Sequence, residues 1–151
     1  MFKQFLATLL ILLSVQLNAK ADSDSLEIKA AKSLFDKYIE LGAKFDSSLS
    51  NLYSDTADIQ NTRYYPNGQT KTMKMPAAAY KQMIAASMPI AKARNDQDSY
   101  SKTTYKQEGE TVRIQSLRHS HLKNYDSWLV LVVGKEGKDW KILQELSQSR
   151  P

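Results

Sequence analysis

The chain of 151 residues contains no cysteine. Disulfide bonds, thiolate catalysis, cysteine-based metal sites and an acylated N-terminal cysteine anchor are therefore excluded. Histidine is scarce, with only His119 and His121 present. No glycine-rich phosphate loop, serine nucleophile elbow or paired-carboxylate spacing is found. Without disulfides, the domain has to be stabilised by its core alone. After residue 21 no apolar run is long enough for a membrane helix.

The first 21 residues have the features of a secretory signal peptide. Lys3 gives a positive start, residues 5 to 17 are mostly apolar, and Ala19-Lys20-Ala21 is a small-x-small cleavage site. The apolar stretch is too short to span a bilayer comfortably. We therefore expect cleavage after Ala21, a periplasmic or secreted protein, and no stable membrane span after cleavage.

Length and charge indicate one mildly basic domain over residues 22 to 151. The formal net charge of the whole chain is +5, and its lysines are scattered along the sequence. A nucleic-acid-binding protein normally shows a clustered basic stripe. We therefore expect no nucleic-acid partner.

The first part of the mature chain is predicted to be helical. Apolar residues recur at helical spacing over residues 26 to 41, and Gly42 follows as a stop. A shorter helix is predicted over residues 47 to 53. An extended segment at 59 to 65 and another at 70 to 75 flank Pro66-Asn67-Gly68, which is typical of a hairpin turn. Pro76 then starts a helix, which Pro89 is expected to kink or end, with at most one further turn to Arg94.

The second part of the chain is rich in residues that favour strands. Four runs, at 100 to 106, 111 to 122, 127 to 133 and 140 to 147, predict an antiparallel meander. Residues 128 to 133 are apolar at every position, which predicts a central strand covered on both faces. In the second run the apolar alternation shifts between Ile114 and Leu117. A β-bulge near Gln115 and Ser116 would place Leu117, His119 and His121 on the inner face.

This order of elements resembles the cone-shaped fold of the nuclear transport factor 2-like superfamily. Short motifs support the resemblance: residues 37 to 41 in the first helix, residues 52 to 59 entering the first strand, and Trp140-Lys141-Ile142 opening the last. They are similar to patterns of the SnoaL-like and ketosteroid-isomerase-like members. The resemblance implies an α+β fold, in which a strongly bent antiparallel sheet packs on about three N-terminal and central helices around a largely apolar pocket.

The resemblance also allows a test for steroid-isomerase chemistry, which needs a tyrosine donor, a carboxylate base and a second, protonated acid. Tyr38 falls at the tyrosine position. The base position falls on or beside Asn61, which cannot accept a proton at neutral pH. The third group would lie within residues 128 to 133, which contain no acid. That isomerase mechanism is therefore rejected, and we expect a binding protein rather than an enzyme.

Several side chains are candidates for ligand contact, each with a plainer structural alternative. Tyr38 could donate to a ligand or be a core tyrosine, and Asn61 could orient a ligand or be an ordinary strand residue. His119 and His121 could act as a general base or remain structural. Without a third ligand in a recognisable spacing, no metal site and no cofactor are expected. Arg113 and Arg118 could pair with an anionic ligand such as a carboxylate, or lie on the outer face with solvated ends.

The leading hypothesis is an exported protein that binds a small, largely apolar ligand, or a partner protein, in its pocket or on its sheet. The predicted ligand-binding residues are Tyr38, Asn61, Leu117 and His119. One alternative is a lyase, cyclase or isomerase with His119 or His121 as base and with Tyr38 and Asn61 as polar partners. Another is a homodimeric interaction module of the cell envelope that associates through the sheet.

Overall fold

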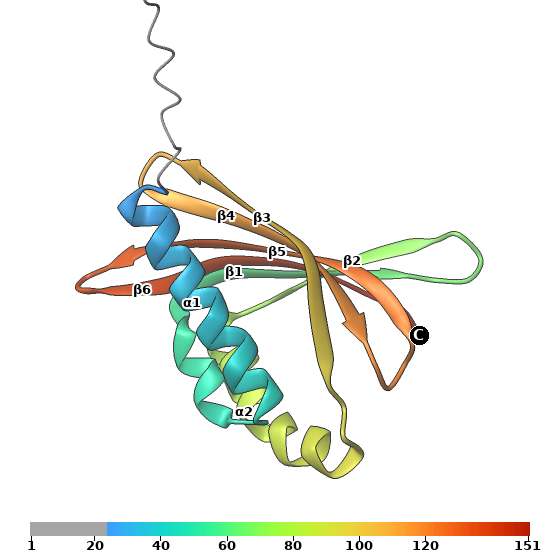
Figure 1. Ribbon diagram of the computed structural model, residues 1–151. Coiled ribbons are helices and arrows are strands. Elements are labelled where there is room, and N and C mark those ends of the chain that lie inside the picture. Colours follow the sequence, from blue (N-terminus) through green and yellow to red (C-terminus); the bar gives the residue numbers. More distant parts are fainter. Residues whose placement is uncertain (1–23) are drawn as a thin grey trace, which may run out of the picture.

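A computed structural model describes residues 24–151 of the chain (Figure 1). The predicted signal peptide, residues 1 to 21, lies outside the described residues. The elements follow in the order α1 (Leu26–Ala43), the short 3-10 helix η1 (Ser47–Leu52), β1 (Tyr53–Tyr64), β2 (Thr70–Met75), α2 (Ala77–Arg94), β3 (Asp98–Glu108), β4 (Thr111–Ser120), β5 (Tyr125–Glu136) and β6 (Asp139–Ser149). No helix within the described residues is long and apolar enough to cross a membrane.

The six strands form one mixed sheet in the order β2-β1-β6-β5-β4-β3. Strands β3 to β6 form the predicted antiparallel meander, and β1 and β2 form the predicted hairpin. Gly68 has a φ of 82° in the hairpin turn, a conformation that glycine adopts without steric cost. The pairing of β1 with β6 is parallel, whereas the sequence predicted a purely antiparallel sheet. Local sequence patterns carry no signal for two strands this far apart in the chain.

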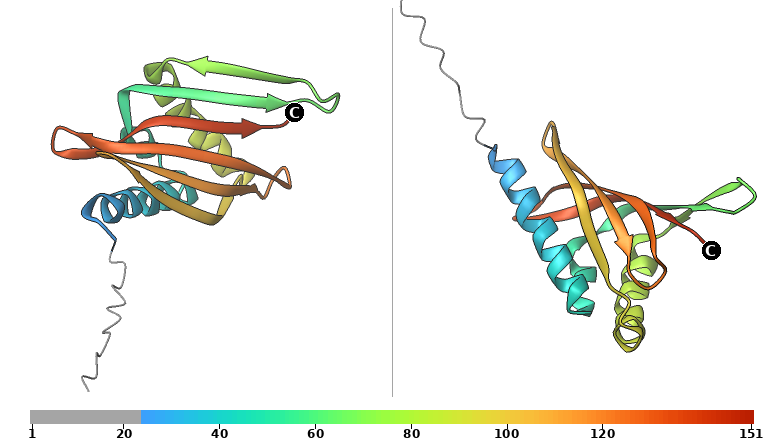
Figure 2. Two further views of the ribbon diagram at one scale, coloured as in Figure 1. Left: turned by 90° about the horizontal axis from the view of Figure 1, so that it is seen from above. Right: turned by 45° about the vertical axis from the view of Figure 1, so that its right-hand side comes forward.

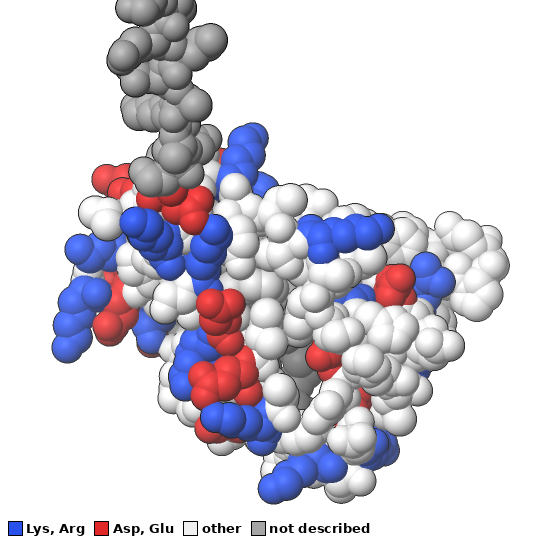
Figure 3. Space-filling model, viewed as in Figure 1, with Lys and Arg blue, Asp and Glu red and all other residues white. Residues whose placement is uncertain are grey.

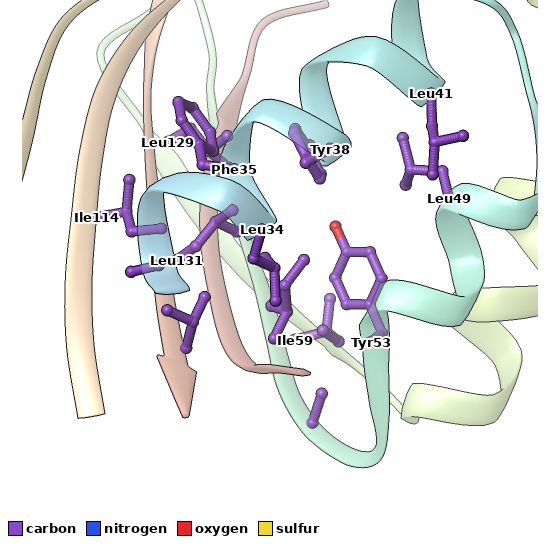
Figure 4. Close-up of a cluster of buried hydrophobic side chains, with 14 of the residues drawn as sticks. Leu34, Phe35, Tyr38, Leu41, Leu49, Tyr53, Ile59, Ile114, Leu129 and Leu131 are labelled. Atoms are coloured by element: carbon purple, nitrogen blue, oxygen red, sulfur yellow. The ribbon is translucent and has the colours of Figure 1, made fainter. Parts of the chain in front are cut away.

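Both long helices lie on the concave side of the bent sheet (Figures 1 and 2). The side chain of Ser25 accepts a hydrogen bond from the backbone N–H of Ile28 and caps α1. Apolar residues of α1 then recur at helical spacing and pack against the inner face of β4 and β5 (Figure 4). The buried side chains of α1 are Ala31, Leu34, Phe35, Tyr38 and Leu41.

The predicted β-bulge in β4 is wrong. Strand β4 pairs with β5 without interruption from Thr111 to Ser120. The irregularity lies instead in β3, between Ser101 and Thr104, where Lys102 has a φ of 51°. Ser116 therefore keeps the inward phase of Ile114, and its hydroxyl is paired with Thr103 Oγ1 at 2.8 Å. Because its hydroxyl has a hydrogen-bond partner, Ser116 can be buried in the core, which the pattern of apolar residues alone would not predict.

The convex face of the sheet has no helix over it among the described residues (Figure 2). The prediction that both faces of the central strand would be covered is therefore wrong. Inward side chains of β5, such as Leu129 and Leu131, are fully buried, whereas Trp128 on the other face is 37% exposed. The sheet thus presents a partly exposed apolar outer face.

Candidate functional site

The helices and the concave side of the sheet enclose a cavity of about 310 Å³. This volume suits a small organic molecule. Residues of α1, α2, β3, β4 and the turn after β4 form its wall, with apolar side chains such as Ile84 and Met88 on the α2 side. Five tyrosines also line it, namely Tyr38, Tyr53, Tyr80, Tyr100 and Tyr125. The wall therefore combines apolar surface with hydroxyl groups.

A buried carboxylate fixes two of these tyrosines. Glu145 on β6 is only 1% exposed, and Tyr80 donates a hydrogen bond to its Oε1 at 2.8 Å. Tyr53 donates a short hydrogen bond to its other oxygen. The two rings pack edge to face, with centroids 5.4 Å apart. Glu145 does not itself line the cavity, so its role is to hold the two tyrosines in place.

Tyr38 and Tyr100 form a second aromatic pair in the cavity wall. Their rings pack edge to face at 6.1 Å, and Phe35 packs against both. Burial raises the pKa of Tyr38, and it raises the pKa of Tyr53, Tyr80 and Tyr100 well above the ordinary value. These phenols stay protonated at physiological pH. They can donate or accept hydrogen bonds, but they cannot serve as phenolate bases.

Arg118 brings a positive charge into this aromatic cavity. Its guanidinium donates to Ser127 Oγ and to the backbone carbonyl of Gln148 at 3.0 Å, and these bonds fix its plane. The ion pair with Asp98 is loose, with Nε and Oδ2 4.0 Å apart. Burial opposes its charge, yet the phenolic and acidic groups around it raise the pKa of Arg118 overall. The guanidinium therefore stays charged and can still pair with an anion.

Asp98 lies at the cavity wall beside Arg118. Burial raises the pKa of its carboxyl group, while the charge of Arg118 acts in the opposite direction. Asp96 and Lys123 also line the cavity. The charged groups thus gather where β3 begins and β4 ends, whereas the opposite wall on α2 is apolar.

The structure places the predicted site residues in three different settings. Tyr38 lines the cavity. Asn61 does not; its amide donates to Ser147 Oγ at 3.0 Å and accepts from Ser149 Oγ at 2.8 Å within the sheet. Leu117 and His119 lie on the outer face of β4, opposite the predicted side, because the strand has no bulge.

The two histidines are neighbours but lie away from the cavity wall. Their ring centroids are 5.0 Å apart, and His119 Nδ1 is 2.7 Å from Asp126 Oδ1. His121 is exposed in the turn after β4. Within residues 24–151 no group of three or more metal-binding side chains is found. The inward placement on which the histidine-base alternative depended is therefore wrong.

Sequence reasoning missed the residues that give the cavity its polarity. Arg118 was weighed as an outward residue, yet strict alternation from Val112 would have placed it inward with Ser116 and Ser120. Glu145 falls on the inner face of β6 next to Ile142 only after a shift in the register of that strand. Tyr80 lies in the helix that was predicted to start at Pro76, and no role was predicted for it. Its pairing with Glu145 spans 65 residues and leaves no local signal.

Solved structures share this architecture at low sequence identity. An NTF2-like protein of unknown function from Shewanella baltica has a TM-score of 0.60 and 14% identity, covering 85% of this chain and 99% of that chain. A similar protein from Pseudomonas putida has a TM-score of 0.63 and 12% identity, covering 81% and 85%. A candidate scytalone dehydratase from Novosphingobium aromaticivorans has a TM-score of 0.54 and 16% identity, covering 80% and 82%. No protein-family model and no curated protein sequence matches the chain.

The chain therefore has the nuclear transport factor 2-like fold, an α+β fold in which helices pack on a bent sheet. The predicted resemblance is confirmed at the level of the fold. Because a fold of this kind hosts unrelated activities, the function has to be argued from the cavity itself.

Proposed function

We propose that the protein acts after export as a small-molecule binding protein. The ligand would have an apolar body and an anionic, oxygen-bearing end, such as a carboxylate. The observation that carries the proposal is the position of Arg118 in a cavity lined largely by tyrosines and apolar side chains, with Lys123 as a second basic residue beside Asp96 and Asp98. Two nitrogens of the Arg118 guanidinium are already bonded to Ser127 and Gln148, which fixes its plane and, within residues 24–151, leaves Nη1 free to donate to a carboxylate.

The surrounding groups support this orientation of a ligand. Tyr38 and Tyr100 offer hydroxyls on the β3 side, whereas Ile84 and Met88 offer apolar contact on α2. Glu145 holds Tyr53 and Tyr80, so this part of the wall is ordered before a ligand arrives. Preorganisation of this kind lowers the entropy cost of binding.

The same groups favour binding over catalysis. The cavity tyrosines stay protonated, and both histidines lie away from its wall. The similarity to a candidate scytalone dehydratase concerns the fold, so that activity is not transferred to this chain.

A thermal-shift screen of small carboxylates, each paired with its neutral amide, tests the proposal on residues 22 to 151. We expect some carboxylates to raise the melting temperature more than their amides do. Arg118→Lys keeps the charge but loses the planar guanidinium that Ser127 and Gln148 hold in place, so it should reduce that difference. Ala91→Phe, which fills the cavity from α2, should abolish binding of both forms. Equal shifts in wild type and in both variants, or none in wild type, would overturn the proposal.

Self-association through the sheet is a second candidate role. The outer face exposes Trp128 next to Leu117, its direct partner across the β4–β5 ladder. Apolar surface of this kind often marks an interface. Sedimentation of wild type and Trp128→Glu would test this role. A dimer is expected only for wild type, and a wild-type monomer at high concentration would contradict it.

A further inference from the structure

One stretch of the chain is basic without any acidic residue. Residues 59 to 95 contain Arg63, Lys71, Lys74, Lys81, Lys92 and Arg94, while all 16 acidic residues of the protein lie outside it. The stretch comprises most of the β1–β2 hairpin and the whole of α2. The stretch is therefore basic because acidic residues are absent from it, although the lysines are scattered along the whole chain.

Most of these charges are free of ion pairs among the described residues. Lys81 is the exception, since its Nζ lies 2.6 Å from Asp55 Oδ1. The other ion pairs of residues 24–151 involve none of the remaining five basic side chains. Figure 3 shows basic side chains at the lower end of the molecule, where α2 ends, whereas acidic and basic side chains mix over α1.

Helix α2 also exposes apolar side chains that its own domain does not cover. Ala77 and Ile84 face the core, but Met83 is 46% exposed and Ile90 is 56% exposed. The exposed apolar residues Ala79, Met83, Ala86, Ile90 and Ala93 follow one another three or four positions apart, and we call them the α2 strip. This spacing puts them on one side of the helix.

Positive charge lies beside the α2 strip. At 100° per residue, Arg94 falls next to the strip, whereas Lys92 falls nearer the opposite side of the helix. Strand β2, which leads into α2, is exposed along its whole length and adds Lys71 and Lys74 with Met73 and Met75, which are 43% and 37% exposed. Strand β2 ends next to the start of α2, and the turn of the hairpin projects from the sheet at the other end of β2 (Figures 1 and 2).

We propose that the α2 strip and the adjoining hairpin dock on an anionic lipid bilayer surface. Met83 and Ile90 would enter the boundary between headgroups and acyl chains, and the unpaired lysines and arginines would contact lipid phosphates. A second copy of the chain fits this surface poorly because it would bring the same positive charges against the first set. The inference is independent of the cavity and of its ligand.

Vesicle flotation with residues 22 to 151 tests the proposal, since the N-terminal leader would itself bind lipid. We expect binding to vesicles of phosphatidylglycerol and phosphatidylcholine, little binding to pure phosphatidylcholine, and weaker binding as salt rises. The double variant Met83→Asp and Ile90→Asp should bind at least about tenfold more weakly. Leu26→Asp is the matched control, because Leu26 is 81% exposed at the start of α1.

Three results would overturn the proposal. They are no binding to the anionic vesicles, equal binding to neutral vesicles, and equal loss in Leu26→Asp and in the double variant. Binding of an acidic protein without binding of anionic vesicles would count against it as well. Circular dichroism checks that each variant is folded. We expect the fold to be retained, because Met83 and Ile90 are largely exposed.

Discussion

Single residues decide how polar the cavity is, and Glu145 is the most consequential of them. Its carboxylate is buried and accepts hydrogen bonds from Tyr53 and Tyr80. Glu145→Leu is expected to lower the free energy of unfolding by about 2–4 kcal/mol, because both hydroxyls lose their acceptor in a buried site. Glu145→Gln keeps an acceptor oxygen and should cost less.

Urea unfolding measures the effect of the Glu145 variants. Glu110→Leu in the exposed turn between β3 and β4 is the matched control and should change stability by less than about 0.5 kcal/mol. A Glu145→Leu protein as stable as wild type would contradict this account of the site.

The titration of Asp98 is the second prediction at the scale of a residue. Burial raises the pKa of its carboxyl group, so it should titrate above the ordinary value of 3.8. The folded state then binds this proton more tightly than the unfolded state does. The contribution of Asp98 to the free energy of unfolding therefore falls as the pH rises from the pKa of the unfolded state to the raised pKa of the folded state.

NMR titration of the Asp98 carboxyl carbon measures this pKa directly. Arg118→Met should raise the pKa further, since the positive charge of Arg118 favours the ionised carboxylate. A titration at or below 3.8 in wild type would show that the carboxyl is better solvated or better paired than the structure indicates.

At the scale of elements, α2 combines a functional surface with an internal proline. The helix continues from Ala77 to Arg94 through Pro89, which lacks an N–H and crowds the preceding turn. Pro89→Ala is expected to raise the free energy of unfolding by about 1–3 kcal/mol. Pro76→Ala is the control, because a proline just before the first helical residue costs little.

Thermal or urea unfolding compares the two proline variants. A Pro89→Ala protein no more stable than wild type would contradict the expectation that Pro89 costs α2 stability.

The helices and strands were predicted well from the sequence, but the side of the sheet that each residue faces was predicted less well. The turn at Asn67-Gly68, the helix through Tyr38 and the four-strand meander all follow from local patterns, and the structure confirms them. The error lay in β4, where Ser116 was read as a break in the alternation. Its hydroxyl is paired inside the core, so a polar residue kept the inward phase. Polar residues with buried partners are the positions at which apolar periodicity misleads.

Only part of the cavity wall could be predicted from the sequence. Tyr38 was predicted because the resemblance puts it at the tyrosine position of the steroid-isomerase site. Arg118, Tyr80 and Glu145 were not, because their roles arise from contacts between distant elements. Asn61 was placed by counting along the first strand, and the structure shows it bonded within the sheet.

At the scale of the whole molecule, the account requires export and cleavage. Expression in a bacterial host should give a periplasmic or secreted protein whose N-terminal residue is Asp22, since the small-x-small site ends at Ala21. Mass spectrometry of the fractionated protein measures this. Ala19→Arg and Ala21→Arg together should block cleavage and leave a protein with its leader attached. A full-length wild-type protein in the cytoplasm would contradict the prediction.

The most direct test of the central claim is a crystal structure of residues 22 to 151 grown with a mixture of small aromatic and aliphatic carboxylates. The account predicts a bound molecule in the cavity, with its carboxylate within hydrogen-bond distance of Arg118 and its apolar body against Ile84 and Met88. A cavity closed by its own side chains, or a ligand whose charged end points away from Arg118, would contradict it.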